Sequence, residues 1–404
     1  MQVAGVGRSR NRNSLEAGQE AAREALASLG GRRAVAVLVF GTAGHDQGAL
    51  LKGVTAVTGD APLAGCSAEG VITRHGSEEV SHAVAVCAIA ADAISARTFL
   101  VPGFSSDSAA CGRALADQIA RCGLQGRLLV LFPDGIGGNC TALVRALEAA
   151  LPSPLVIVGG TAGDLLTFQR TFQYHGLEAT SGAVSALLLG GDFAAEIEVT
   201  HGCDLIGAER VVTRAEAGFV CAIDDQSAWS FFKEYLADDA DTLEALHVAH
   251  LLLAEHVPQG TPEFGDFTVR VPVRLDSERG ALYFAAGLES GTRVQLARRN
   301  PDKVCEHAMA AARRLTERHP GARPFLVLDL DCAGRGALLF GDETNASLFE
   351  PMQRIFGEDV PWVGLHTYGE VGPVGGQTLF HNYTSVLCAL YAGASSDPVR
   401  APRE

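Results

Sequence analysis

The chain has 404 residues, of which 47% are hydrophobic, so it is long and apolar enough to bury the cores of two domains. Its formal net charge of −15 argues against nucleic acid and membrane surfaces as partners, because both attract cationic proteins. The longest apolar runs have the length of strands and are interrupted by polar residues, so no membrane span is predicted.

The arrangement of the cysteines and the first ten residues of the chain indicate the cellular compartment of the protein. The ten cysteines are scattered, with neither a Cys-x-x-Cys pair nor the Cys/His spacing of a zinc site. We therefore expect reduced, mostly buried thiols, and neither a metal nor a cofactor. The first ten residues lack the apolar segment of a secretory signal. Together these features predict a cytoplasmic protein.

The first part of the chain predicts an α-β-α-β-β-β unit. Ser14 has the hydroxyl of a helix N-cap, and apolar residues follow at helical spacing until Gly30. Strands are expected at residues 34–40, 63–67, 83–91 and 94–100. The second helix is expected between the first two strands, at residues 47–57. The last two runs are separated by only two residues, which predicts a hairpin.

The same order of elements recurs twice. The second copy is expected at residues 108–200, with Asn139 capping its second helix, and the third at residues 301–391. One strand of each copy ends in glycine, small or hydroxyl residues and an acid, namely Glu69, Asp164 and Glu370. In the first copy the acid precedes the second glycine rather than following it. We interpret the pattern as an internal duplication.

Residues 201–300 separate the second and third copies. They predict a strand at 219–223, helices at 228–236 and 243–254, and a hairpin formed by 267–275 and 281–286. The predicted fold is therefore mixed α/β, with repeated units forming layered sheets covered by helices in two domains. The predicted divisions are an N-terminal helical segment 1–33, α/β domains 34–210 and 211–394, and a frayed tail 395–404.

Several enzyme signatures are missing from the sequence. It contains no Gly-x-Gly-x-x-Gly after a first strand, no phosphate-binding P-loop, no Gly-x-Ser-x-Gly elbow and no His-Glu-x-x-His helix. These absences make a binding protein a better interpretation than an enzyme.

Two stretches resemble a known family. The run from Gly159-Gly-Thr-Ala-Gly-Asp164 to Gly190 resembles the N-terminal half of the FIST family. Cys332-Ala-Gly-Arg335, Tyr368-Gly-Glu370 and His381-Asn382 resemble its C-terminal half. The resemblance covers about residues 34–392. It implies an intracellular sensory module for small ligands, with amino acids suggested, here in a stand-alone form that signals to a separate protein.

The ligand site is expected after the strands of the third copy. Arg335 can hold a carboxylate with its planar fork, and Glu370 can accept an ammonium group, which together would suit a free amino acid. Thr367 lies in the turn before Glu370, and Thr161 and Asp164 are further candidates in the N-terminal half. Alternatively, Arg335 and Glu370 form a structural ion pair, and Asp164 binds the amides of its own turn.

A second hypothesis is an enzyme, perhaps hydrolytic. Cys332 would be its nucleophile if His381 lay close enough to act as a base. Otherwise Cys332 is a small residue in a tight turn. His381 and Asn382 either line the ligand pocket or bind the backbone where a strand begins.

Overall fold

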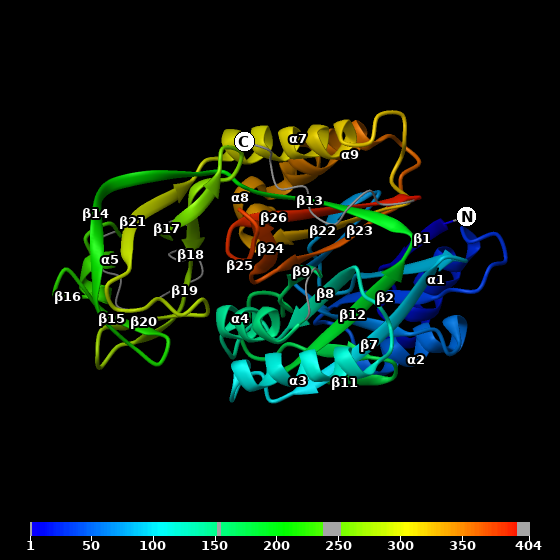
Figure 1. Cartoon of the computed structure of the whole chain (residues 1–404), viewed down its shortest axis with the longest axis horizontal. Coiled ribbons are helices and arrows are strands. Elements are labelled where there is room, and N and C mark those ends of the chain that lie inside the picture. The colour runs from blue at the N-terminus through cyan, green and yellow to red at the C-terminus, as the bar shows by residue number, and fades with distance from the viewer. Residues whose placement is uncertain (1, 152–154, 237–251, 394–404) are drawn as a thin grey trace.

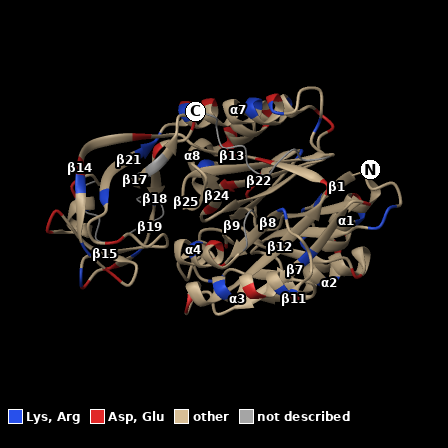
Figure 2. Cartoon of the chain, in the orientation of Figure 1, with Lys and Arg blue, Asp and Glu red and all other residues tan. Residues whose placement is uncertain are grey.

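The computed structural model describes residues 2–151, 155–236 and 252–393. Three six-stranded mixed sheets form a body, and a fourth sheet stands beside it (Figure 1). The predicted mixed α/β fold of repeated units is confirmed. Charged side chains of both signs are spread over outer helices such as α3 (Ser108–Arg121) and α7 (Pro301–Glu317) (Figure 2). No helix in the described ranges is both long and apolar enough to cross a bilayer.

The first sheet has the strand order β1-β6-β2-β3-β10-β11. These strands are Gln2–Ser9, Val84–Ala91, Ala36–Thr42, Leu63–Ala68, Gln173–His175 and Glu178–Thr180. Helices α1 (Ser14–Ala27) and α2 (Gln47–Thr58) pack on one face. Asn13, rather than the predicted Ser14, caps α1 by accepting the Glu16 N–H.

The second and third sheets repeat this plan. The second has the order β25-β24-β9-β8-β12-β7, and its strands are Gln377–His381, Glu370–Val374, Val156–Gly160, Leu128–Pro133, Ala183–Gly191 and Ile94–Pro102. The third has the order β13-β26-β22-β23-β4-β5, and its strands are Phe193–His201, Thr384–Ala392, Leu326–Cys332, Trp362–Thr367, Gly70–Thr73 and Gly76–Glu78. Helices α3 and α4 (Cys140–Ala150) cover the second sheet, and α7 and α9 (Glu350–Phe356) cover the third. Asn139 caps α4, as predicted.

Each sheet is completed by a hairpin from another copy of the unit. Hairpin β4–β5 of the first copy joins the third sheet, β10–β11 of the second joins the first, and β24–β25 of the third joins the second. The three copies therefore form a closed ring, in which no copy builds a complete sheet alone.

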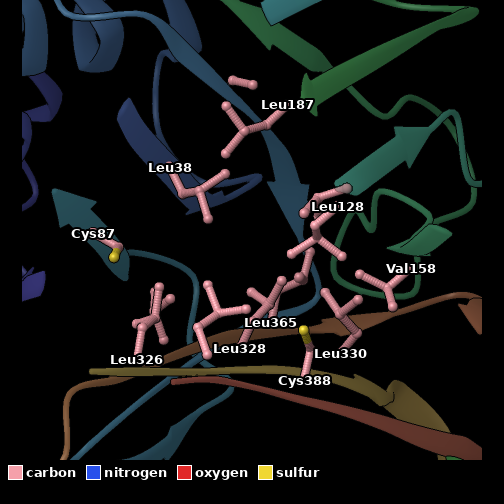
Figure 3. Packing of buried hydrophobic residues seen from close by; sticks show 14 of the residues in the cluster. Leu38, Cys87, Leu128, Val158, Leu187, Leu326, Leu328, Leu330, Leu365 and Cys388 are labelled. Atoms are coloured by element: carbon pink, nitrogen blue, oxygen red, sulfur yellow. The ribbon is translucent and has the colours of Figure 1, made fainter. Parts of the chain in front are cut away.

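The inner faces of the three sheets meet in one apolar core. Leu38 from the first sheet, Leu128 and Leu187 from the second, and Leu328 and Leu365 from the third lie within it (Figure 3). Burial of each such side chain contributes about 1.5–3 kcal/mol to folding. Because strand side chains alternate, the neighbouring residues on β22 face the outer helices instead.

The interruption predicted between copies two and three forms the fourth sheet. Its order is β18-β17-β21-β14-β15-β20-β19, with β16 paired to β15. The strands, from β14 to β21, are Cys203–Glu216, Phe219–Ile223, Gln226–Ser227, Leu252–Thr261, Gly265–Arg270, Pro272–Asp276, Ala281–Phe284 and Arg293–Arg299, and α5 is Ala228–Lys233. The Tyr283 hydroxyl donates to the Gly138 carbonyl at 2.9 Å and tethers this sheet to the body.

Some local predictions were wrong. Strands β6 and β7 belong to different sheets rather than to a hairpin, and so do β12 and β13. A short turn shows only that the chain reverses direction. Which strand each strand pairs with depends on packing of its apolar face against residues distant in the sequence. Strand β1 was missed, because no element was predicted before the helix at Ser14. Residues 252–254 begin β17 and do not end a helix; residues 243–251 and the predicted tail 395–404 lie outside the described residues. The hairpin around 276–280 is confirmed as β19–β20.

Candidate functional site

A polar cluster is buried between the third sheet and its helices. Asp329 and Asp331 lie on β22, His366 on β23 and Ser385 on β26, and Arg335 follows β22 in a 3₁₀ turn, Ala333–Arg335. All five residues are at most 1% exposed. Burial of this many ionisable groups costs free energy unless they are paired with one another.

The other two copies show that the fold does not require this cluster. Glycines 364, 65 and 159 occupy matching positions, each so close to the carbonyl of its partner strand that an added Cβ would lie 2.1, 1.9 or 2.5 Å from that oxygen. The partner residues are Asp329, Val39 and Leu131 respectively. Two residues further on, Asp331 corresponds to Gly41 and Pro133. Of the three copies, only the third places carboxylates at these positions, so the repeated fold does not itself require them, and the cluster is the candidate site.

Arg335 is the central cation of the cluster. Its Nε donates to Asp331 at 3.1 Å (Oδ2) and 3.3 Å (Oδ1), while Nη1 and Nη2, both buried, have no hydrogen-bond partner among the described residues. A guanidinium can donate five hydrogen bonds, and two of its three nitrogens are unused here. An anion bound at the fork of the side chain would satisfy both nitrogens.

The two carboxyl groups of β22 have different electrostatic surroundings. Burial and the neighbouring Asp331 raise the pKa of Asp329 well above its usual range. Burial also raises the pKa of Asp331, but the Arg335 charge opposes that rise. The Arg335 charge and hydrogen bonds donated by the Trp362 Nε1 (3.3 Å) and the Ser385 hydroxyl (3.2 Å) lower the pKa of Asp329, but by less than burial and Asp331 raise it. We therefore infer a neutral Asp329 and an ionised Asp331 that balances Arg335.

His366 connects the cluster to hairpin β4–β5, which the first copy contributes to the third sheet. Its Nε2 lies 2.7 Å from the Ser77 Oγ on β5 and 3.5 Å from the Glu79 Oε1. Its Nδ1 lies 3.9 Å from the Asp331 Oδ1 and forms no hydrogen bond within the described structure. The groups that complete the site thus come from the first and third copies of the unit.

Glu370 does not pair with Arg335 through a hydrogen bond or ion pair in the described structure. Its carboxyl accepts from the Thr367 hydroxyl and from the amide (3.1 Å) and hydroxyl (2.7 Å) of Thr384. Burial raises the pKa of Glu370 to about 8 despite these hydrogen bonds. Strand register also corrects the proposed repeat equivalence, because Glu370 faces Gly160 and therefore corresponds to Gln173 and Val71, not to Asp164 or Glu69.

The structure does not form a Cys332–His381 dyad. Burial raises the pKa of Cys332 well above its usual range. His381 has Nδ1 3.2 Å from the Thr268 hydroxyl and Nε2 3.1 Å from the Gly372 carbonyl, and burial lowers its pKa to about 3. The thiol therefore stays protonated at neutral pH, with the imidazole engaged elsewhere. The Asn382 amide donates to the Tyr368 carbonyl at 3.1 Å.

Asp164 organises its own turn, as the alternative interpretation expects. Its carboxylate accepts the amides of residues 168, 169 and 170 at 2.9, 2.7 and 2.9 Å, and the Tyr368 hydroxyl at 2.7 Å. Burial alone would raise its pKa, but hydrogen bonds from Thr167, Tyr368 and these amides lower it. The Thr161 hydroxyl is buried without a partner in the described structure, and its amide donates to the Gly369 carbonyl at 2.8 Å.

Sequence reasoning identified Arg335 but missed the groups around it. Asp329, Asp331, His366 and Ser385 were not singled out, nor was Ser77 on a distant hairpin. The available signal was the Asp-x-Asp pattern that interrupts an apolar strand. No group of three or more His, Cys, Asp and Glu side chains within the described ranges is arranged to hold a metal ion.

Comparison with protein families gives two matches. Residues 35–226 match the FIST N domain, and residues 228–373 match the FIST C domain. The chain belongs to the FIST family. FIST domains are regarded as sensory domains that bind small ligands. The site described above draws Ser77 from the FIST N region and Arg335 from the FIST C region.

Related FIST proteins offer no established activity. An uncharacterized protein of Mycobacterium tuberculosis is 29% identical over 95% of this chain and 98% of its own length. An uncharacterized protein of Mycobacterium bovis is 26% identical over 95% of this chain and 97% of its own. Among solved structures, cyanuric acid hydrolase from A. caulinodans has a TM-score of 0.29 and 10% identity, and covers 47% of this chain and 71% of its own. That likeness carries no functional argument.

Proposed function

We propose that this FIST protein is a cytoplasmic sensor whose site binds a small metabolite bearing a carboxylate. The observation that carries the proposal is the buried guanidinium of Arg335, with Nη1 and Nη2 unpaired within the described structure. Two parallel N–H···O bonds from an arginine fork match the geometry of a carboxylate. A bound anion would satisfy donors that are otherwise costly to bury.

The acidic groups beside Arg335 favour a ligand that also carries a cation. Asp331 is already within 3.1 Å of the guanidinium, and Asp329 lies two residues away on the same face of β22. A free amino acid presents a carboxylate and an ammonium only a few bonds apart, so it would complement both charges. Asp331 would take the role first assigned to Glu370, as the acceptor of the ammonium group.

The fourth sheet provides a route from the site to a partner protein. Arg299, at the end of β21, donates to the Gly334 carbonyl, and its guanidinium lies over the Tyr383 ring at 5.2 Å. Gly334 immediately precedes Arg335. A ligand that repositions Arg335 would shift the 3₁₀ turn and, through Arg299, the fourth sheet, which a signalling protein could then recognise.

A thermal-shift and calorimetry screen with amino acids and related carboxylates tests the proposal. A true ligand at one hundred times its Kd should stabilise the wild type by about 2.7 kcal/mol. Arg335→Lys keeps the charge but loses the fork, so the stabilisation should fall sharply. Arg313→Lys, on the exposed face of α7, is the matched control and should respond like the wild type. A ligand that stabilises the Arg335→Lys variant equally would exclude this site.

A further inference from the structure

Two residues of the polar cluster, His366 and Asp331, form a chain of contacts with Ser77 of β5. The Ser77 Oγ lies 2.7 Å from the His366 Nε2, and the His366 Nδ1 lies 3.9 Å from the Asp331 Oδ1. We propose that this FIST protein also has esterase activity, with Ser77 as nucleophile, His366 as general base and Asp331 as the group that orients the imidazole. The three residues come from strands β5, β23 and β22, which lie in one sheet.

Ser77 is held in a fixed position for this role. Asn345, in the π-helical turn Asn345–Phe349, accepts the Ser77 amide at 2.6 Å and donates to the Ser77 carbonyl at 3.1 Å. Both backbone groups of the serine are therefore occupied, while its hydroxyl contacts the imidazole. A nucleophile whose backbone is already held by hydrogen bonds loses little conformational entropy when a substrate binds.

The Ser77–His366 hydrogen bond is compatible with the required tautomer in one of its two possible directions. If Nε2 accepts the Ser77 hydroxyl proton, Nδ1 carries the ring hydrogen, and Asp331 is the acidic group near it. The separation of 3.9 Å is longer than a hydrogen bond, and such contacts often tighten only when a substrate is bound. Asp331 is fixed by Arg335, so the charge that would stabilise an imidazolium is already in place.

The chemistry follows from these positions. The Ser77 oxygen attacks the carbonyl carbon of the ester while its proton passes to the His366 Nε2. The tetrahedral adduct collapses, the bond to the alcohol oxygen breaks, and His366 returns the proton to that oxygen. Water then attacks the acyl-serine, again losing a proton to His366, and the adduct releases the acid and the restored Ser77 hydroxyl.

Glu79 contacts both Ser77 and His366, and its side chain is 13% exposed. Its Oε1 is 3.4 Å from the Ser77 Oγ, 3.5 Å from the His366 Nε2, and accepts the amide of the exposed Ala337 at 2.8 Å. A substrate entering beside Ala337 must displace this carboxylate. Removal of the Glu79 side chain should therefore speed the reaction of Ser77.

If Arg335 binds a carboxylate, as in the proposed function on which this step rests, the esters that fit the site are limited to those that carry a carboxylate. Its unpaired amino groups belong to the same cluster, because Asp331 contacts Arg335 and lies near His366. A carboxylate elsewhere on the substrate would bind there while its ester carbonyl lies at Ser77. The expected substrates are small esters that carry a free carboxylate.

Labelling with a fluorophosphonate probe tests the nucleophile without any ligand. Ser77 in the wild type should be modified, as located by peptide mass mapping. His366→Gln should slow the modification about 100-fold or more, and Ser77→Ala should abolish it. Glu79→Ala should accelerate it. The matched control is Ser81→Ala, because the Ser81 Oγ also touches a histidine, His82 Nδ1 at 3.0 Å, but in an exposed pair.

Two results would overturn the proposal. One is an unmodified Ser77 in protein that melts cooperatively, in both the wild type and Glu79→Ala. The other is equal labelling of the wild type and His366→Gln. Hydrolysis of mono-4-nitrophenyl succinate compared with 4-nitrophenyl acetate then tests the substrate class. Labelled Ser77 with no preference for the succinate ester would overturn that substrate class, but neither the nucleophile nor the carboxylate site, which the Arg335→Lys comparison tests.

Discussion

Asp331 is the residue on which the charge balance of the site depends. It pairs with a fully buried arginine and lies near the histidine that contacts Ser77. A buried ion pair contributes little net stability, yet loss of one partner leaves an uncompensated charge in a medium of low polarity. Each charge in the cluster therefore depends on the others for compensation, and single substitutions within it should strongly lower the stability of the folded protein.

Asp331→Asn should destabilise the protein by about 3–5 kcal/mol, because the guanidinium of Arg335 then remains buried without a counter-charge. Urea denaturation measures the change. The matched control is Asp117→Asn, which removes an exposed partner of Arg121 at 3.6 Å and should change stability by no more than about 0.5 kcal/mol. Equal effects of the two substitutions would show that Asp331 does not hold Arg335 in the folded state.

Glu370 should make stability depend on pH. Burial raises its folded-state pKa to about 8 from an ordinary 4.5, so the folded protein binds more protons than the unfolded chain between these values. Stability from this group is complete below pH 4.5 and decreases as the pH rises towards 8. Between pH 5 and pH 7 the loss should be about 2–3 kcal/mol.

Glu370→Gln removes this titration, and denaturation curves at pH 5, 6 and 7 provide the measurement. The variant should show a smaller decrease than the wild type over the same range. Parallel decreases in the two proteins would mean that Glu370 titrates normally. Glu358→Gln is a suitable control, since Glu358 is exposed and should leave the wild-type slope unchanged.

At the scale of elements, the glycines at the matching positions 65, 159 and 364 allow the central strands to approach one another closely. Gly364 on β23 lies so close to β22 that a Cβ would be 2.1 Å from the Asp329 carbonyl oxygen. Gly364→Ala should therefore destabilise the protein by about 1–3 kcal/mol, by forcing the strands apart. Gly48→Ala, in α2 with nothing closer than 3.5 Å, should be neutral or stabilising by up to about 1 kcal/mol. Thermal melts compare them, and an unaffected Gly364→Ala would contradict the close packing.

The elements also show how much the sequence can predict. Periodicity located most helices and central strands because each buries an apolar face that repeats along the chain. It placed β6 and β7 in one hairpin because their separation suits a tight turn, but β7 pairs with β12 in the next sheet. Arg335 stood out as a cation after a strand. Ser77 could not be linked to it, since only the exchange of β4–β5 brings that hairpin to the third sheet.

The ring arrangement has consequences for the whole molecule. Residues 1–202 contain most of the FIST N match, but they lack β24 and β25 of the second sheet and β22, β23 and β26 of the third. A fragment of these residues should fail to fold cooperatively, as measured by circular dichroism and amide exchange. Co-expression with residues 203–404 should restore the fold. A stable fragment would show that the first two copies form an independent domain.

The exchanged hairpins also order events during synthesis. The first sheet has all its strands once residue 180 has left the ribosome, but the second waits for residue 381 and the third for residue 392. Until then the inner faces of β8, β12 and β22 lack part of the core that covers them. The nascent chain therefore exposes apolar strands through most of its translation, and its yield in a cell should depend on chaperones that bind such segments.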